Sequence, residues 1–260
     1  MLLARAILLN ADITIVNPSS SPFKAIDANH VYTITSLVPM QIQLVLAEAN
    51  GTSVLNRFKH ILLGGAPIHA QLNNAIQQLD CEVWHTYGMT ETLSHIALRN
   101  IKHETEFHLL PDNFIATDER HCLKIKNRIT QNNWLQTNDI VEIKQQAFVV
   151  IGRYDFIINS GGFKVNALKV EDEILIYLNQ QQIQNVLFFV SSIPNDLLGQ
   201  KVVLVVKQGI FTKLLFESLQ AALKQVLHSY EVPKEVIEVP EFFYTLSQKL
   251  DRNKIMLQVK

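Results

Sequence analysis

The sequence predicts an α/β fold made of a βαβ body, an attached antiparallel β subdomain and a small α+β domain at the C-terminus. Over about the first hundred residues, short apolar runs alternate with stretches of helical periodicity, which indicates βαβ units and a mainly parallel sheet. From Phe114, four short β-rich runs follow one another without a helix, which is typical of an antiparallel meander or a small barrel. We therefore expect a partial N-terminal domain over 1–153, divided into 1–100 and 101–153, and a mobile C-terminal domain over 154–260.

The first elements follow from apolar spacing. Residues 1–9 are helical in pattern, and residues 12–16 (DITIV) and 31–35 (VYTIT) have the composition of strands. Pro39 stands where the first turn of a helix tolerates proline, ahead of the periodic stretch MQIQLVLAEA.

Two strand-to-turn junctions come next. Residues 60–63 form a short buried strand that ends in Gly64-Gly65, and Pro67 opens a helix that runs to about Leu79. Residues 82–85 (EVWH) form another strand, which Gly88 ends. From Thr90 to Leu98 the spacing is again helical.

The C-terminal domain begins with a glycine loop at Gly161-Gly162. Asn166 is a favourable N-cap for the helix ALKVEDEILIYLNQ. The strands VLFFV and KVVLVV follow, and a second helix is expected from about Thr212 to His228.

The composition excludes several classes of protein. Lys plus Arg is 23 and Asp plus Glu is 24, so the formal charge of −1 offers no basic surface for nucleic acid or for a membrane. Cys81 and Cys122 lack the spacing of a zinc site or a disulfide framework, and no apolar run reaches the length of a membrane span. A cytoplasmic protein is the expectation.

The most informative local unit is VWHTYGMTETLSHIAL at 83–98. Glycine permits a tight turn after the strand, and the N–H groups of a helix that starts near Thr90 favour a phosphate. Glu91 adds a carboxylate suited to Mg²⁺. An ordinary helix capped by threonine explains the same residues equally well.

Other candidates are weaker when taken singly. The small residues Gly64-Gly65-Ala66-Pro67 let a flat group such as adenine approach the backbone, but they also suit a plain tight turn. Asp139 could accept hydrogen bonds from a ribose diol or could cap a turn. Arg153 and Asp155 could form a surface ion pair, and Lys249 has the features of a solvated terminal lysine. The nine histidines have no metal-binding spacing, and neither a G-x-S-x-G elbow nor a P-loop occurs.

In this order and at these distances, the motifs resemble those of the adenylate-forming superfamily, which includes acyl-CoA synthetases, luciferases and peptide-synthetase adenylation domains. The shared motifs are GGAP at 64–67, YGMTE at 87–91, Asp139, GRYD at 152–155 with the following SGGFKV, and QKLDR with Lys249. Within the superfamily, MLLARAILL, SLVPMQIQ at 36–43 and YGMTETLSHIAL are most similar to the o-succinylbenzoate–CoA ligases of menaquinone biosynthesis.

The resemblance implies a role for each matching residue. Gly64, Gly65 and Ala66 would line the adenine site beside Tyr87 and Gly88. Thr90 would contact the α-phosphate, Glu91 would hold Mg²⁺, and Asp139 and Arg153 would bind the ribose. Lys249 would bridge the carboxylate and the α-phosphate as the acyl-adenylate forms. Asp155 would be the hinge of the small domain, and the Gly161-Gly162 loop would then face the site for attack by the thiol of CoA. Arg5 is the candidate for the free carboxylate of a dicarboxylic acid, and Ser94 and His95 are candidates for the acyl pocket.

The resemblance therefore implies an acid–thiol ligase that uses ATP, Mg²⁺, a small carboxylic acid and CoA. The family's Ser/Thr/Gly-rich phosphate loop would lie upstream of residue 1, so we expect weak ATP binding and little acyl-adenylate formation by these residues alone. Other aryl or medium-chain acids, a carrier thiol in place of CoA, and a non-catalytic nucleotide-binding fragment remain open. So does the oligomeric state, a homodimer included.

Overall fold

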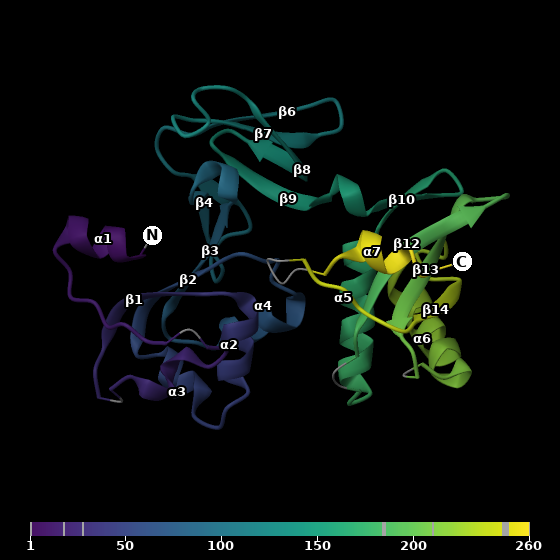
Figure 1. The fold of residues 1–260 in the computed structure, drawn as a ribbon, viewed down its shortest axis with the longest axis horizontal. Coiled ribbons are helices and arrows are strands. Elements are labelled where there is room, and N and C mark those ends of the chain that lie inside the picture. Colours follow the sequence, from purple (N-terminus) through teal and green to yellow (C-terminus); the bar gives the residue numbers. More distant parts are fainter. Residues whose placement is uncertain are drawn as a thin grey trace. The chain divides into compact units, whose positions relative to one another are not determined.

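The structure is a computed structural model that describes residues 2–17, 19–27, 29–183, 186–209, 211–245 and 250–259. The chain divides into two compact units, Met1–Ile151 and Gly152–Lys260 (Figure 1). They are called unit 1 and unit 2 below.

Unit 1 is built on a curled sheet with the strand order β1-β2-β3-β4-β5-β9-β8-β7-β6 (Figure 1). The strands are β1 (Tyr32–Leu37), β2 (Phe58–Leu63), β3 (Glu82–Gly88), β4 (His95–Asn100), β5 (Phe107–Leu109), β6 (Phe114–Thr117), β7 (Cys122–Lys126), β8 (Leu135–Lys144) and β9 (Ala147–Arg153).

The sheet changes from parallel to antiparallel along its width. β1 with β2 and β2 with β3 pair in parallel, whereas β3 with β4, β4 with β5 and β5 with β9 pair antiparallel. The strands β6 to β9 are consecutive neighbours, which confirms the meander predicted from the short β-rich runs. The prediction of a mainly parallel sheet is correct only for the first three strands.

Unit 1 contains short helices. They are α1 (Leu2–Leu9), α2 (Pro39–Leu46), α3 (Gly51–Leu55), α4 (Ala70–Ile76) and the 3₁₀ turn η1 (Pro22–Ala25). Of these, α2, α3 and α4 pack on the parallel strands. Ile42 of α2 and Ile76 of α4 are fully buried in one hydrophobic cluster with Ile61 of β2 and Val83 of β3. This cluster fixes the helices on the strands that carry the candidate site.

Two helix boundaries differ from prediction. Pro39 does begin α2, as predicted, but Pro67 does not begin α4. His69 has extended backbone angles (φ −70°, ψ 154°), so helical hydrogen bonding starts only after it, and α4 ends at Ile76 rather than near Leu79.

The strand predicted at 12–16 is wrong. Residues 11–17 have neither helical nor strand hydrogen bonding, and Ile15 is 81% exposed. A strand requires a partner for its backbone N–H and C=O groups, and the sheet of the described residues ends at β1. The alternation of Ile13 and Ile15 is therefore present without the pairing that would make it a strand.

The helix predicted from Thr90 to Leu98 is also wrong. Thr90–Thr92 forms a single 3₁₀ turn, η2, Leu93 has a left-handed backbone (φ 59°), and the chain then returns as β4. The spacing of Leu93, Ile96 and Ala97 satisfied a helical template, but the antiparallel partner β3 supplies the hydrogen bonds instead. Leu93 is 66% exposed, which a core-facing helical position would not be.

Unit 2 contains a sheet in the order β11-β10-β13-β12, with β14 paired to β13. Its elements are β10 (Ile157–Ser160), β11 (Phe163–Asn166), α5 (Ala167–Gln180), β12 (Phe188–Asn195), β13 (Gly199–Lys207), α6 (Lys213–Val226), β14 (Glu235–Val239), α7 (Arg252–Met256) and the 3₁₀ turn η3 (Tyr154–Phe156).

The central strand β13 separates two hydrophobic clusters. Its Val202, Leu204 and Val206 pack with α5 and α6, whereas Val203 and Val205 pack with Ile255 of α7 on the other face. This alternation is the period of a strand buried on both faces. Asn166 caps α5 by accepting a hydrogen bond from the N–H of Leu168, as predicted. Thr212 caps α6, which ends at Val226 rather than His228.

None of the helices described here is both long enough and apolar enough to cross a membrane. Cys81 and Cys122 are both buried.

Candidate active site

The turn after β2 lies against the neighbouring strand β3. Gly65 has a left-handed backbone (φ +88°), which glycine adopts without steric cost. A Cβ on Gly64 would lie 2.1 Å from Oγ1 of Thr86, so the turn approaches β3 more closely than any other residue would permit. The predicted segment Gly64-Gly65-Ala66 is thus half-exposed to exposed and open to a flat ligand.

The end of β3 is joined to β8. The hydroxyl of Tyr87 donates a hydrogen bond of 2.5 Å to Oδ2 of Asp139. The ring of Tyr87 packs edge-on against Phe148, at 5.0 Å between centroids, and against Phe107, at 5.7 Å. Asp139 is 9% exposed and lies inside β8, so it does not cap a turn. Two predicted residues 52 positions apart therefore share one face of the sheet.

In the loop after Gly88, Thr90 and Glu91 are exposed to solvent. Thr92 is buried and makes the hydrogen bonds within the loop. Oγ1 of Thr92 lies 3.0 Å from the carbonyl of Met89 and 2.8 Å from that of Ser94, which share its one hydrogen, and it accepts from the N–H of Met89. Thr90 is not an N-cap, because Met89 precedes the 3₁₀ turn. The argument from a helix N-terminus for a phosphate at Thr90 is therefore wrong.

A cation lies beside the predicted acyl residues. Nη2 of Arg5, on α1, donates to Oγ of Ser94 at 3.3 Å, and Oγ of Ser94 lies 3.4 Å from Nδ1 of His95. Burial and the nearby guanidinium of Arg5 lower the pKa of His95. The structure thus brings together all three residues predicted for the acyl pocket.

Two polar residues on the same face were missed. Nη2 of Arg99, on β4, lies 3.3 Å from Nδ1 of His85, on β3, and the backbone of Ala66 lies near enough to the His85 ring to act on its pKa, in the raising direction. Burial, with the charge of Arg99, lowers the pKa of His85 to about 4, and burial lowers the pKa of Arg99. The available signal was strand alternation, since His85 lies two positions before Tyr87 and shares its face.

The described site residues of unit 2 lie on turns, except Arg153, which ends β9. Gly161 (φ +57°) and Gly162 (φ +84°) form the exposed turn between β10 and β11. Nη2 of Arg153 donates to Oδ2 of Asp155 at 2.8 Å, and the two side chains are 43% and 39% exposed. This is the surface ion pair that the sequence allowed. Lys249 lies outside the described residues.

The donor set for magnesium is sparse. The described residues contain no group of three or more His, Cys, Asp or Glu side chains that could hold a metal ion. The carboxylate of Glu91 is exposed. That arrangement fits Mg²⁺ if a bound nucleotide supplies most of the ligands, as is usual for magnesium at phosphates.

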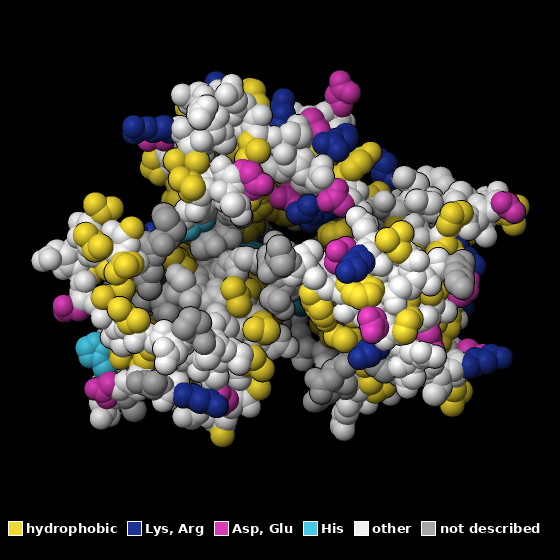
Figure 2. All heavy atoms as spheres, in the orientation of Figure 1, with side chains coloured by type: hydrophobic (Ala, Val, Ile, Leu, Met, Phe, Trp, Pro, Cys, Tyr) yellow, Lys and Arg dark blue, Asp and Glu magenta, His cyan; other side chains and the backbone are white. Residues whose placement is uncertain are grey.

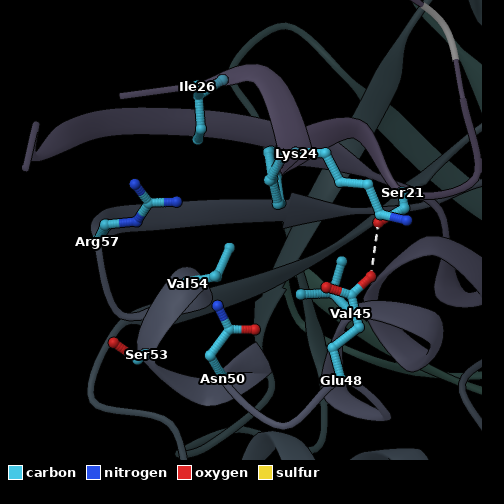
Figure 3. Close-up of a pocket in the computed structure, with 10 residues that line it drawn as sticks. Ser21, Lys24, Ile26, Val45, Glu48, Asn50, Ser53, Val54 and Arg57 are labelled. Carbon is cyan, nitrogen blue, oxygen red and sulfur yellow. Dashed lines mark hydrogen bonds between the residues drawn. The ribbon is translucent and has the colours of Figure 1, made fainter. Parts of the chain in front are cut away.

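Unit 1 also has a hollow of about 310 Å³ at the opposite end of β2 (Figure 3). Its walls combine apolar side chains with two cations and one carboxylate, namely Ser21, Phe23, Lys24, Ile26, Val45, Glu48, Asn50, Ser53, Val54 and Arg57. Ser21 donates to Glu48 across it at 2.7 Å. Arg57 directly precedes β2, whereas Gly64 directly follows it, so the hollow is separate from the site described above.

Comparison with known proteins identifies the family. The sequence profile described as "AMP-binding enzyme" matches residues 2–112. A solved structure of an acyl-CoA synthetase (AMP-forming)/AMP-acid ligase II-like protein from Dyadobacter fermentans is 33% identical, covers 94% of this chain and 69% of its own, and has a TM-score of 0.52. The chain belongs to the AMP-binding enzyme family.

One curated protein and one further solved structure show how far the similarity extends. The 2-succinylbenzoate–CoA ligase of Listeria monocytogenes is 27% identical over 88% of this chain and 52% of its own length. The o-succinylbenzoate coenzyme A synthetase of Bacillus subtilis, solved in complex with ATP and magnesium, has the same fold with a TM-score of 0.69 at 21% identity, over 86% of this chain and 51% of that one. The chain spans about half the length of the curated relatives it matches.

Proposed function

We propose that this chain binds AMP and acyl-adenylates as part of an acid–CoA ligase that activates o-succinylbenzoate for menaquinone biosynthesis. The observation that carries the proposal is the hydrogen bond between Tyr87 and Asp139 beside the Gly64-Gly65 turn. It joins an aromatic ring to a buried carboxylate at the end of β3, and the exposed backbone of the turn lies against the neighbouring Thr86; these are groups that a nucleoside needs.

Each group has a chemical counterpart in the nucleotide. The backbone of Gly64, Gly65 and Ala66 borders the adenine, and the ring of Tyr87 stacks on it. Asp139 accepts from the ribose hydroxyls, since a carboxylate has about four acceptor positions. Arg153 assists at the same sugar.

The reacting groups lie at the phosphate. Thr90 donates its exposed hydroxyl to the α-phosphate. Gly88, two positions earlier, keeps the backbone before Thr90 close enough to the nucleotide for that contact. Glu91 holds Mg²⁺, which neutralises phosphate charge when it is bound. Lys249 stabilises the charge that develops as the carboxylate attacks the α-phosphate, so its effect belongs to the transition state.

The acid lies against Arg5, Ser94 and His95. A guanidinium binds a carboxylate through two parallel hydrogen bonds, and o-succinylbenzoate has a second carboxylate that is not activated. The contact between Arg5 and Ser94 supports this assignment because it holds the cation beside the loop that carries Glu91. Other aryl or medium-chain acids that lack the second carboxylate are the competing substrates.

The second step transfers the acyl group to the thiol of CoA. Asp155 serves as the hinge, and the Gly161-Gly162 turn then faces the adenylate. An exposed glycine turn suits this role because it brings no side chain between the thiol and the acyl carbon.

Titration of the chain with AMP tests the nucleotide site. We expect saturable binding that Asp139→Ala weakens by about tenfold or more, the cost of a lost charged hydrogen bond. Asn138→Ala, at the adjacent position of β8, is the matched control and should bind as wild type. Equal binding by wild type and Asp139→Ala would contradict the assignment.

Pyrophosphate exchange with a panel of acids tests the substrate, using a polypeptide that also carries the phosphate loop. Arg5→Leu should reduce the preference for o-succinylbenzoate over benzoate by about 10²-fold, because it removes a charged partner of the free carboxylate. Lys249→Ala should abolish exchange and leave AMP binding intact. Unchanged exchange in Lys249→Ala would remove this lysine from the mechanism.

A further inference from the structure

We propose that His85 is a positioning residue for the adenine-binding turn: its ring holds the backbone of Ala66, and Arg99 holds the ring. This inference rests on the proposed function, because it assigns the turn at Gly64-Gly65-Ala66 to the base. The contacts that carry it lie wholly within unit 1.

Strand register places the three groups in line. Leu63 of β2 is the register partner of His85, and His85 is the register partner of Arg99 on β4. The turn leaves β2 directly after Leu63, and the backbone of Ala66 lies near enough to the His85 ring to raise its pKa. Neighbouring Thr86 lies against Gly64, so consecutive residues of β3 touch the turn at both of its ends.

The contacts also fix which ring nitrogen carries the proton. A guanidinium has only donors, so Nη2 of Arg99 must donate and Nδ1 of His85 must accept. The hydrogen of the neutral ring then lies on Nε2, which leaves it free to donate to the carbonyl of Ala66. The lowered pKa agrees with a ring that stays neutral at physiological pH.

Arg99 is itself held in place. Its guanidinium lies 5.2 Å from the centre of the Phe107 ring, and its Nη1 donates to the carbonyl of Thr105 at 3.4 Å. The charged groups that act on this pair are Arg99 itself, on His85, and the nearby Glu104, on Arg99. Protonation of His85 would turn Nδ1 into a donor facing a donor, so the arrangement requires the neutral ring.

The turn needs such a restraint because its sequence is permissive. Two consecutive glycines allow many backbone conformations, and Gly65 already uses the left-handed region. A hydrogen bond that selects one conformation before the ligand arrives lowers the ordering cost of binding. His85 would therefore strengthen the binding of the base without touching it.

The test compares two polar variants in the full chain. His85→Gln retains an N–H donor close to the Nε2 position, whereas the shorter His85→Asn cannot reach Ala66. We expect His85→Asn to weaken AMP binding about tenfold, the effect of one lost hydrogen bond, and His85→Gln to stay within about threefold of wild type. His108→Asn, on the exposed side of neighbouring β5, is the matched control and should bind as wild type.

The affinity for ribose 5-phosphate distinguishes the positioning role from a general structural defect, because such a defect would change this affinity too. It lacks the base, so its affinity should be the same in wild type, His85→Gln and His85→Asn. Parallel loss of AMP and ribose 5-phosphate binding in His85→Asn, or AMP binding equal to wild type, would overturn the positioning role. A wild-type chain that binds AMP no better than ribose 5-phosphate would overturn the proposed adenine site and this inference with it.

Discussion

In unit 1 two residues assigned to the nucleotide, Tyr87 and Asp139, are joined across the sheet, whereas in unit 2 the assigned residues lie on turns or, for Arg153, at a strand end. Tyr87 and Asp139 are fixed by a direct hydrogen bond, and the ring of Tyr87 is fixed by two phenylalanines. Gly161 and Gly162 occupy an exposed turn, where the N–H of Gly161 donates to the carbonyl of Leu198 at 2.9 Å. Strand register therefore preorganises the groups proposed to bind the nucleotide, while the groups proposed to act in sequence belong to a second compact unit.

The two units also differ in how completely they bury their apolar side chains. Eleven large apolar side chains are exposed within residues 3–44 of unit 1, against eight among the described residues of the whole of unit 2. Those over α1 are visible as a group at the left of Figure 2. They are Leu3, Ile7, Leu8 and Leu9, with exposed fractions of 56 to 84%. An apolar group of this kind normally meets another surface, whereas unit 2 closes its cores on itself.

The largest expected loss of stability is in unit 2 alone. Glu171 accepts two hydrogen bonds from Arg252, at 2.7 and 2.8 Å, and one from the N–H of Val190. Glu171→Ala leaves a guanidinium that is only 20% exposed without its carboxylate, so we expect unit 2 to lose about 3 kcal/mol of unfolding free energy.

The two tryptophans make this measurement specific to one unit. Trp84 and Trp134 both lie in unit 1, so urea unfolding followed by tryptophan emission should not change in Glu171→Ala. The transition followed by circular dichroism should shift. Glu217→Ala, in an exposed ion pair of α6, is the control. A shift of the tryptophan transition would show that the units unfold together.

The next effect falls on unit 1. A Cβ on Gly88 would lie 2.5 Å from both Cα of His95 and the carbonyl oxygen of Ser94, and both are backbone atoms that cannot turn aside. Gly88→Ala should therefore cost about 2–3 kcal/mol, read by tryptophan emission. Gly162→Ala in unit 2 meets no atom within 4 Å and should cost only the left-handed strain, about 1–2 kcal/mol. A smaller loss for Gly88→Ala than for Gly162→Ala would contradict the close approach.

Most of the elements of unit 2 could be predicted from the sequence because each is specified locally. Asn166 supplies its own cap for α5, and the run KVVLVV is apolar at every position that two cores require. The turn at Gly64-Gly65 and the start of α2 at Pro39 were predictable for the same reason, since glycine and proline act through their own backbone.

The predictions are wrong where pairing with strands distant in the sequence determines the local structure. Residues 90–98 satisfy a helical template, but pairing with β3 makes them a turn and a strand. Residues 12–16 alternate as a strand does but find no partner among the described strands. His85 was overlooked because its contacts depend on the register of β2, β3 and β4, which no local pattern encodes. The contacts of Tyr87 with Asp139 and of Arg5 with Ser94 are non-local too, and only the family resemblance suggested that these residues share a site.

Acid should lower the unfolding free energy of unit 1 through the protonation of His85. Its pKa is about 4 in the folded protein and 6.5 in a free side chain, so the unfolded chain takes up a proton first as the pH falls. Stability of unit 1 is therefore fully present above pH 6.5 and is lost between about 6.5 and 4, by about 2 kcal/mol at pH 5. Tryptophan-monitored unfolding at pH 7 and pH 5 measures this, and His85→Gln should reduce the difference. An undiminished difference in His85→Gln would assign the acid sensitivity to other groups, of which His95 is the first to test.

The smallest effect compares two ion pairs of the same chemistry within unit 2. Asp155 and Arg153 are joined at 2.8 Å, like Glu171 and Arg252, but their side chains are 39% and 43% exposed, against 13% and 20% for the latter pair. Water screens an exposed pair and solvates whichever partner remains, so Asp155→Ala should change the unfolding free energy by no more than about 0.5 kcal/mol. Circular dichroism in urea measures both variants under one protocol. A loss in Asp155→Ala approaching that of Glu171→Ala would mean that the Arg153 pair stabilises the unit, whereas a silent variant leaves Asp155 available for the hinge role proposed for it.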